Sequence, residues 1–307
     1  MTQLSIIIPT KDRGEIFYKT LACAIQATLH TQAEIIIVND SRASRPEIGG
    51  YKTERIRLID NPKSGVAAAR NAGAKSASSE LLLFLDDDIQ INKDSIDQTL
   101  ALHASHPNVC MNPDWIYPNE LQETLSHKSF GRFLVSHNFT SFKGWYNHAQ
   151  WKDNSVFESP MVASFYLSIS KENFNKSGGY DEAFPHAGFE DYDFPVRLRK
   201  MGVRLLINTR AVVYHNEEDR QDLNGWLQRQ VRGGETRRIG VQIGYRELAI
   251  PYSPGKKIIL NSLLIVKPVL VALAGMVPNF KDLDIIYFRL VLTLQAICIF
   301  EGYHKSL

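Results

Sequence analysis

Residues 81–88 read Leu-Leu-Leu-Phe-Leu-Asp-Asp-Asp, an apolar run that ends in three carboxylates. Such a run is typical of a buried strand. Carboxylates crowded at its end repel one another unless a cation or a ligand compensates their charge. In an open α/β sheet ligands bind beyond the carboxyl ends of the strands, so Asp86, Asp87 and Asp88 are expected at a ligand site. Oxygen ligands favour Mg²⁺ or Mn²⁺ and thus phosphate-bearing partners, whereas the plainer alternative is a polar loop after a core strand.

The preceding residues alternate between strand and helix patterns. Strands are expected at residues 4–8, 34–38, 56–59 and 81–85, and helices at residues 15–29 and 65–76. This alternation predicts βαβ units, and hence an α/β fold with a mostly parallel, Rossmann-like sheet flanked by helices. Polar residues follow every one of these strands, so we expect one shared ligand site at this edge of the sheet.

Composition narrows the class of protein. Among the 307 residues, 44% are apolar and 22% charged, as in ordinary globular proteins, and a formal net charge of +2 gives no nucleic-acid footprint. Cys23, Cys110 and Cys298 show no paired or metal-like spacing, which predicts a reducing compartment without a disulfide framework. The strand pattern begins by Leu4 without a basic leader, so we expect no secretory signal and a cytoplasmic catalytic part.

The middle of the chain mixes irregular and regular patterns. Residues 112–159 are rich in aromatic side chains and read as a long irregular segment, which is more often functional than idle. Its Trp145, Tyr146 and Trp151 could stack on a sugar or belong to a core. Further strands are expected at residues 162–170, 203–207 and 211–214, and a helix at residues 190–201.

Six motifs in this order resemble those of the family 2 inverting glycosyltransferases of bacterial polysaccharide biosynthesis. They lie at residues 5–13, 38–41, 65–73, 84–88, 178–182 and 188–193. The resemblance spans about residues 4–215, and the order of the motifs is more specific than any one of them. It implies the GT-A fold, a nucleotide-diphosphate sugar donor, most often a UDP-sugar, and a divalent metal cofactor, Mn²⁺ or Mg²⁺.

The resemblance also implies which residues bind the nucleotide sugar. These residues follow the strands or begin the helix at residue 65: Pro9, Thr10, Asp12, Arg13, Asp40, Gly65, Arg70, Asn71, Asp86 and Asp87. Asp40 would accept the imide N–H of uracil, or else form an Asx turn at the strand end. Residues 65–73 would bring backbone close to a ligand, or else pack a helix on the sheet with Arg70 exposed. Arg13 would meet the diphosphate or be solvated.

The metal and the base are assigned by the same resemblance. Asp88 would bind the metal, Asp86 would contact the ribose or a metal-bound water, and a one-residue shift of this register stays open. His215 would be a further metal ligand, with a structural histidine as the alternative. Asp191 would be the general base and Glu190 would position the acceptor or the base; the alternative is an ordinary acidic first turn of a helix.

The C-terminal region differs in character. A basic helix is expected at residues 224–239, followed by apolar stretches at residues 258–277 and 283–300. Lys267 and Arg289 lie near their centres, and one such charge costs about 2.5–3.5 kcal/mol within a membrane span. Attachment to a membrane surface fits this pattern best, with a weak transmembrane hairpin and a dimer interface as alternatives.

We therefore expect two regions. Residues 1–220 would form the glycosyltransferase domain, with its acceptor side at about residues 112–215, and residues 221–307 a helical extension. The enzyme, of the hexosyltransferase type (EC 2.4), would transfer one sugar to a saccharide or lipid-linked acceptor, as a peripheral protein at the inner face of the plasma membrane and without nucleic acid. The alternatives are a sugar-nucleotide nucleotidyltransferase and a non-catalytic nucleotide-sugar-binding protein.

Overall fold

The computed structural model of the chain describes residues 3–51, 53–146, 151–184 and 188–304. The chain divides into two compact units, each built from two segments. The first comprises Met1–Pro118 and Ser141–Asn216, and the second comprises Asn119–Thr140 and Glu217–Leu307. Residues 119–140, which the sequence analysis places on the acceptor side of the catalytic domain, thus pack with the C-terminal helices.

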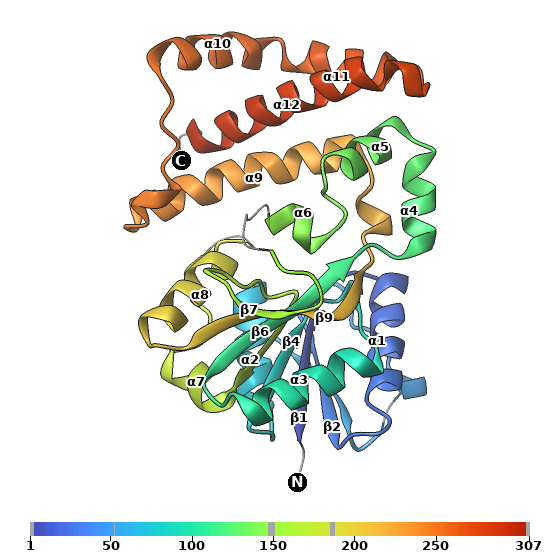
Figure 1. Cartoon of the computed structure of the whole chain (residues 1–307), viewed down its shortest axis with the longest axis vertical. Helices are drawn as coiled ribbons and strands as arrows, with labels where there is room; N and C mark the ends of the chain where they lie inside the picture. Colours follow the sequence, from blue (N-terminus) through green and yellow to red (C-terminus); the bar gives the residue numbers. More distant parts are fainter. Residues whose placement is uncertain (1–2, 52, 147–150, 185–187, 305–307) are drawn as a thin grey trace. The chain divides into compact units, whose positions relative to one another are not determined.

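The first unit is built around one twisted sheet (Figure 1). Along the sheet the strands follow the order β3-β2-β1-β4-β8-β6-β9-β5, and β7 pairs with β9. The strands are β1 (Leu4–Thr10), β2 (Ala33–Asn39), β3 (Ile56–Asp60), β4 (Leu81–Leu85), β5 (Ile89–Gln90), β6 (Val109–Ile116), β7 (Val156–Glu158), β8 (Tyr166–Ser170) and β9 (Arg204–His215). Strands β1 to β4 pair in parallel, as do β6 and β9, and β8 joins the two groups by antiparallel pairing.

Helices cover both faces of this sheet, with α3 in front and α2 behind in Figure 1. The helices of the unit are α1 (Glu15–Ala27), α2 (Val66–Ser76), α3 (Lys93–Ser105), α6 (Phe142–Tyr146), α7 (Lys171–Lys176) and α8 (Glu190–Lys200). Because both faces are covered, β1 and β2 are buried along their whole length, as continuous apolar strands of a parallel sheet should be. The predicted α/β fold is confirmed.

Two expectations about the middle of the chain were wrong. Residues 112–159 contain regular elements, because β6 extends to Ile116 and the helices α4 (Asn119–Ser126), α5 (Ser129–Ser136) and α6 and strand β7 follow. The strands expected at residues 203–207 and 211–214 form one strand, β9. The polar residues between them stay in the strand because its register with β6 shifts there, and because the Asn208 side chain accepts a hydrogen bond from the Arg210 N–H.

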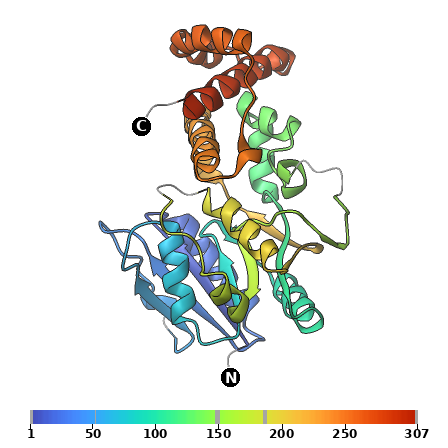
Figure 2. The same ribbon diagram turned by 90° about the vertical axis from the view of Figure 1, so that its left-hand side faces the viewer.

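The second unit consists of helices. They are α4 (Asn119–Ser126), α5 (Ser129–Ser136), α9 (Leu223–Gln242), α10 (Pro254–Ile265), α11 (Lys267–Met276) and α12 (Asp284–His304). Figures 1 and 2 show α12 beside α9, with α10 and α11 on its other side. A bidentate ion pair between Arg132 and Asp284 joins α5 to α12.

Glycines set the distance between α9 and α12. A Cβ on Gly234 would lie 2.2 Å from the Ile299 carbonyl oxygen, and one on Gly302 would lie 1.9 Å from that of Val231. Both obstacles are backbone atoms, which cannot rotate away. The two helices therefore touch at their backbones.

Within the described residues, one helical stretch, Lys281–His304, is long and apolar enough to cross a membrane. The pair of α10 and α11 also passes that test, but the two helices are bent by 65° relative to each other. A third of the most apolar part of the long stretch is buried in the protein.

The glycine contact predicts that Gly234→Ala destabilises the second unit. Overpacking of this kind costs about 1–3 kcal/mol, so the melting temperature in differential scanning fluorimetry should fall by several degrees. Gly233→Ala is the matched control, since its Cβ would meet nothing within 4 Å and alanine favours the helix. Equal melting temperatures for the two variants would contradict the close packing.

Candidate active site

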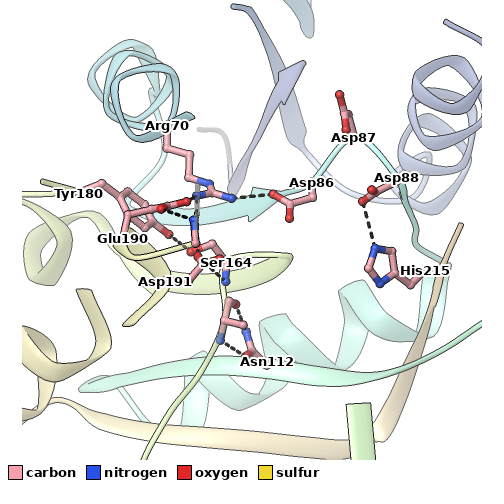
Figure 3. Close-up of polar contacts among 12 residues, drawn as sticks. Arg70, Asp86, Asp87, Asp88, Asn112, Ser164, Tyr180, Glu190, Asp191 and His215 are labelled. Atoms are coloured by element: carbon pink, nitrogen blue, oxygen red, sulfur yellow. Dashed lines mark hydrogen bonds and ion pairs between the residues drawn. The ribbon is translucent and has the colours of Figure 1, made fainter. Parts of the chain in front are cut away.

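The acidic loop that follows β4 is fixed at both ends by backbone hydrogen bonds. The Asp86 N–H donates to the Phe165 carbonyl (2.9 Å), and the Asn216 N–H donates to the Asp88 carbonyl (2.7 Å). Antiparallel pairing of β5 with β9 sets Ile89 opposite His215. The end of β9 is thereby brought to the end of β4, which places His215 beside the acidic loop (Figure 3).

Asp88 lies between two cationic or metal-binding groups. Arg13 Nη2 donates to Asp88 Oδ2 at 2.7 Å, and His215 Nε2 is 3.4 Å from Asp88 Oδ1. Arg13 Nε also lies 3.3 Å from Asp87 Oδ1, so this side chain is not merely solvated. The ring of Trp115 packs edge-on against His215, with centroids 4.9 Å apart, which holds the imidazole toward the carboxylate.

Burial and mutual repulsion disfavour the ionised carboxylates of this loop, so a nearby positive charge would stabilise them. Burial and the adjacent Asp88 raise the pKa of Asp87 to about 7, although Arg13 and a hydrogen bond from Thr10 oppose the rise. Burial also raises the pKa of Asp86, against the effect of Arg70. A bound cation would restore these carboxylates to their ordinary acidity.

Arg70 connects the acidic loop to the acidic start of α8 (Figure 3). Its Nη2 donates to Asp86 Oδ1 at 2.8 Å, and its Nη1 donates to Glu190 Oε1 at 3.2 Å and lies 3.8 Å from Asp191 Oδ1. Its guanidinium also lies over the ring of Tyr180, 5.2 Å from the centroid.

The environment of Arg70 corrects one alternative considered for this helix. Arg70 is 2% exposed. The alternative for residues 65–73 combined close packing of the helix with an exposed arginine, and the exposure of the arginine is wrong. Burial by itself lowers the pKa of the guanidinium, but Asp86 and Asp191 raise it well above its usual value. Arg70 is therefore a permanently charged centre of the site.

The two carboxylates at the start of α8 have different surroundings. Glu190 is 2% exposed, and its Oε2 accepts a hydrogen bond from the Gly188 N–H at 2.7 Å. Burial and the charge of Asp191 raise the pKa of Glu190 to about 7. The Asp191 side chain is 34% exposed, and its Oδ1 accepts a hydrogen bond from the Ser164 N–H at 3.3 Å. Of the pair, only Asp191 has the access that an incoming hydroxyl needs.

Asn112 and Ser164, which the sequence analysis did not single out, and Tyr180 of the motif at residues 178–182 fix the segment whose Ser164 N–H donates to Asp191. Asn112 Nδ2 donates to the carbonyls of Ala163 (2.8 Å) and Tyr166 (2.6 Å), and its Oδ1 accepts from the Ala163 N–H. Ser164 Oγ and the Tyr180 hydroxyl lie 2.8 Å apart. A polar Asn112 inside a buried strand was the one signal in the sequence, because a buried amide needs partners.

Asp40 helps to fold the turn into α2. Its Oδ1 accepts hydrogen bonds from Asn61 Nδ2 (2.6 Å) and the Gly65 N–H (3.0 Å), while its Oδ2 is 3.9 Å from Lys11 Nζ. Gly65 has φ +109°, a conformation that favours glycine. These bonds join Asp40 to the segment before α2 and are not those of the Asx turn considered as the alternative, and its role as a uracil acceptor stays a prediction.

The remaining predicted nucleotide residues also lie near the strand ends. Pro9 and the buried Thr10 close β1, and Asp12 follows with φ +53° and accepts a hydrogen bond from Ser44 Oγ. The Asn71 side chain forms hydrogen bonds with the turn at residues 178–182. Its Nδ2 donates to the Tyr180 carbonyl and Glu182 Oε1, and its Oδ1 accepts from the Tyr180 N–H. Direct donor contacts of these residues stay predictions.

The aromatic residues proposed for the acceptor are described in part. The rings of Tyr146 and Trp151 lie 5.8 Å apart, and Trp151 Nε1 donates to Asp153. The side chain of Trp145 lies outside the described residues. Tyr146 and Trp151 both pack on the buried Phe142, so a core role accounts for much of their contact.

The donor atoms around Asp88 suit a divalent metal. Carboxylate oxygens and one imidazole nitrogen form a set that Mn²⁺ accepts well and Mg²⁺ in part. Within the described residues no three such ligands converge, and Asp86 is directed to Arg70. Asp88 and His215 would therefore supply two ligands, and phosphate oxygens and water the others.

Comparison with known proteins identifies the family. The family model described as glycosyl transferase family 2 matches residues 5–187, which is more than half of the chain. The chain belongs to this family. That match covers the strands β1 to β4, the acidic loop and the turn before α8, and it confirms the resemblance drawn from the motifs.

Family 2 relatives include proteins of several kinds. The O-antigen biosynthesis protein RfbC of Myxococcus xanthus is 27% identical over 232 residues, covering 70% of this chain and 17% of the relative. The hyaluronan synthase of Pasteurella multocida is 27% identical, covering 70% and 24%. The validoxylamine A glucosyltransferase of Streptomyces hygroscopicus subsp. jinggangensis is 25% identical, covering 67% and 53%. The chain thus spans about half or less of the length of these relatives.

A solved structure shares the fold. The crystal structure of GalNAc-T7 with UDP, GalNAc and Mn²⁺ aligns with a TM-score of 0.53 and 16% identity, covering 70% of this chain and 43% of that one. The likeness confirms the predicted GT-A fold.

The raised pKa of Glu190 predicts a pH-dependent stability. Between its ordinary value of 4.5 and about 7, the folded protein holds a proton that the unfolded chain has released. The free energy of unfolding should therefore fall as the pH rises through this window. Glu190→Gln should remove this part of the fall, measured by urea unfolding in EDTA at about pH 5 and about pH 8.

The exposed Glu80→Gln serves as the control, and it should keep the slope of the wild-type protein. An unchanged slope in Glu190→Gln would show that Glu190 ionises normally in the folded protein.

Proposed function

We propose that the protein transfers a single sugar, with inversion, from a nucleotide-diphosphate sugar to a saccharide or lipid-linked saccharide, and that the donor is a UDP-sugar. One observation carries the proposal: a partly exposed carboxylate, Asp191, lies in the same charged network as the acidic loop. In this proposal the donor site and the general base thus belong to one connected group of charged side chains. Family membership supports glycosyl transfer as the chemistry.

In this proposal Asp191 is the general base. Its carboxylate removes the proton of an acceptor hydroxyl while that oxygen attacks the anomeric carbon and the bond to the leaving phosphate breaks. Direct displacement from the opposite face inverts the configuration. The Ser164 N–H and Arg70 orient Asp191, while Glu190 fixes Arg70 and the turn at Gly188.

The donor diphosphate would lie at the acidic loop. Asp88 and His215 would hold a divalent metal there, which when bound neutralises charge on the phosphates. Arg13, 2.7 Å from Asp88, lies where it can meet a phosphate once a cation compensates the carboxylates. The uridine would occupy the region of Thr10, Asp12 and Asp40. The Mn²⁺ and UDP named for GalNAc-T7 belong to a protein of the same fold and accord with this choice.

The place of action is also part of the proposal. A family 2 enzyme whose second unit exposes apolar helices beside basic residues suits acceptors carried on lipid. We therefore place the protein at the cytoplasmic face of the membrane, as a peripheral enzyme of glycan biosynthesis.

We expect Asp191→Asn to lower turnover by about 10²- to 10⁴-fold, because an amide cannot accept the proton. Binding of UDP, measured by calorimetry, should change little, since Asp191 does not face the nucleotide in this proposal. Glu80→Gln, an exposed carboxylate elsewhere in the unit, should keep full activity. If Asp191→Asn turns over donor as fast as the active wild type, Asp191 is not the base. If neither protein turns over donor, a binding protein is favoured.

The donor is identified by a screen of nucleotide sugars. With Mn²⁺ or Mg²⁺, slow release of nucleoside diphosphate from one UDP-sugar is expected, and EDTA should abolish it because the carboxylates then repel the phosphates. Asp88→Ala should show the same loss in the presence of metal. No release from any donor, together with no metal-dependent binding of UDP, would overturn the proposed function.

A further inference from the structure

A group of side chains in the second unit includes most of the exposed large apolar residues among the described residues. Most of its members are aliphatic side chains on α10, α11 and the beginning of α12: Ile258, Ile259, Ile265, Val266, Val269, Leu273, Met276, Phe280, Ile285, Ile286 and Leu292. Several are more exposed than buried, including Ile265 (81%) and Met276 (76%). A contiguous apolar surface of this kind marks an interaction site.

Helix α11 has an outer face without charge. Val269, Leu273 and Met276 lie three and four residues apart, so they share one side of the helix, and all are exposed. The one charged residue of α11, Lys267, turns inward, where its Nζ donates to Glu301 Oε2 of α12 at 2.6 Å. The other side of the helix pair packs on α12, where Leu260 joins Ile297 and Phe300 in a small core.

Basic residues accompany this surface. Lys256 and Lys257 begin α10, Lys281 precedes α12 and Arg289 lies on its exposed side. Of the two acidic residues between residues 254 and 292, Asp284 is paired with Arg132, and Asp282 is the exposed one. The charge that borders the apolar face is therefore mostly positive, which suits a surface of anionic lipid headgroups.

The packing of these helices opposes a transmembrane arrangement. Helices α10 and α11, of 12 and 10 residues, are about 18 and 15 Å long, whereas the hydrocarbon core is about 30 Å thick. They are bent by 65°, so they do not form one straight span.

The long helix α12 is held against a basic helix. Its backbone touches α9 at Gly234 and Gly302, and Gln295 Nε2 donates to Gln230 Oε1 at 3.2 Å. A span made by α12 would draw α9 into the bilayer, and α9 exposes Arg232 and Arg237. Charged side chains oppose such insertion.

We propose that α10 and α11 form an in-plane membrane elbow: the apolar side of the bent pair lies shallowly in the surface of an anionic bilayer, and α12 stays in the protein as its support. The inference rests on the membrane attachment in the proposed function and specifies its surface and its mode.

The test is binding of the full chain to vesicles without sugar donor or acceptor. With phosphatidylcholine and phosphatidylglycerol vesicles, co-sedimentation should be strong, and it should weaken with pure phosphatidylcholine. Val269→Glu combined with Met276→Glu should reduce the partition coefficient by on the order of tenfold or more. Both side chains are exposed, so the fold should tolerate the change, which circular dichroism checks. Leu29→Glu, at an exposed leucine of the first unit, is the control and should bind like the wild type.

Depth measurements separate the elbow from a span. A fluorophore on Leu273→Cys, in a Cys23→Ser background because Cys110 and Cys298 are buried, should be quenched best by nitroxide lipids labelled near the headgroup. Strongest quenching by labels at the bilayer centre would overturn the in-plane mode. Dimerisation in lipid-free solution that the double variant abolishes, together with no vesicle binding, would overturn the membrane assignment in favour of a second copy of this chain.

Donor turnover in lipid-free solution separates this inference from the proposed function. If the double variant turns over donor like the wild type but no form of the protein binds vesicles, the elbow fails and the enzyme assignment stands. If vesicle binding follows the pattern above while no donor is turned over, the enzyme assignment fails alone.

Discussion

The site depends on the ion pairs that the buried guanidinium of Arg70 forms. It neutralises Asp86 at the end of β4 and Glu190 at the start of α8, two residues far apart in sequence. Without it, these carboxylates and Asp191 would face one another with no charge of opposite sign between them, at a cost of several kcal/mol. The acidic loop after β4 and the start of α8 are thus held together by one side chain of α2.

The same charges explain why the site is prepared for a ligand. Asp87 and Glu190 have pKa values of about 7 because burial and neighbouring carboxylates disfavour their ionised forms. Positive charge from a metal ion would relieve this, and a diphosphate would then have a counterpart at the acidic loop. The unfavourable interactions among buried carboxylates lie at the place where a bound cation or ligand would reduce them, and perturbed pKa values of this kind are common in active sites.

The second unit depends on a different constraint, the close approach of two backbones. Gly234 and Gly302 let α9 and α12 touch, and this contact holds one side of α12 against the protein although its composition resembles a span. Much of the exposed apolar surface lies on α10 and α11, each of which is too short to cross a bilayer and which are bent by 65° relative to each other. In the proposed elbow, membrane contact and the stability of the unit would depend on different helices.

The sequence by itself determined the α/β sheet, because β1 to β4 are continuous apolar runs separated by helix patterns, and it marked Asp86 to Asp88 and Asp191 through local motifs. Only the tertiary structure decided what joins them. Burial of Arg70, the partners of Asn112 and the different exposure of Glu190 and Asp191 all depend on how distant segments pack. Residues 119–140 joined the C-terminal helices for the same reason. Periodicity reports which face of an element is apolar, but not which other element covers it.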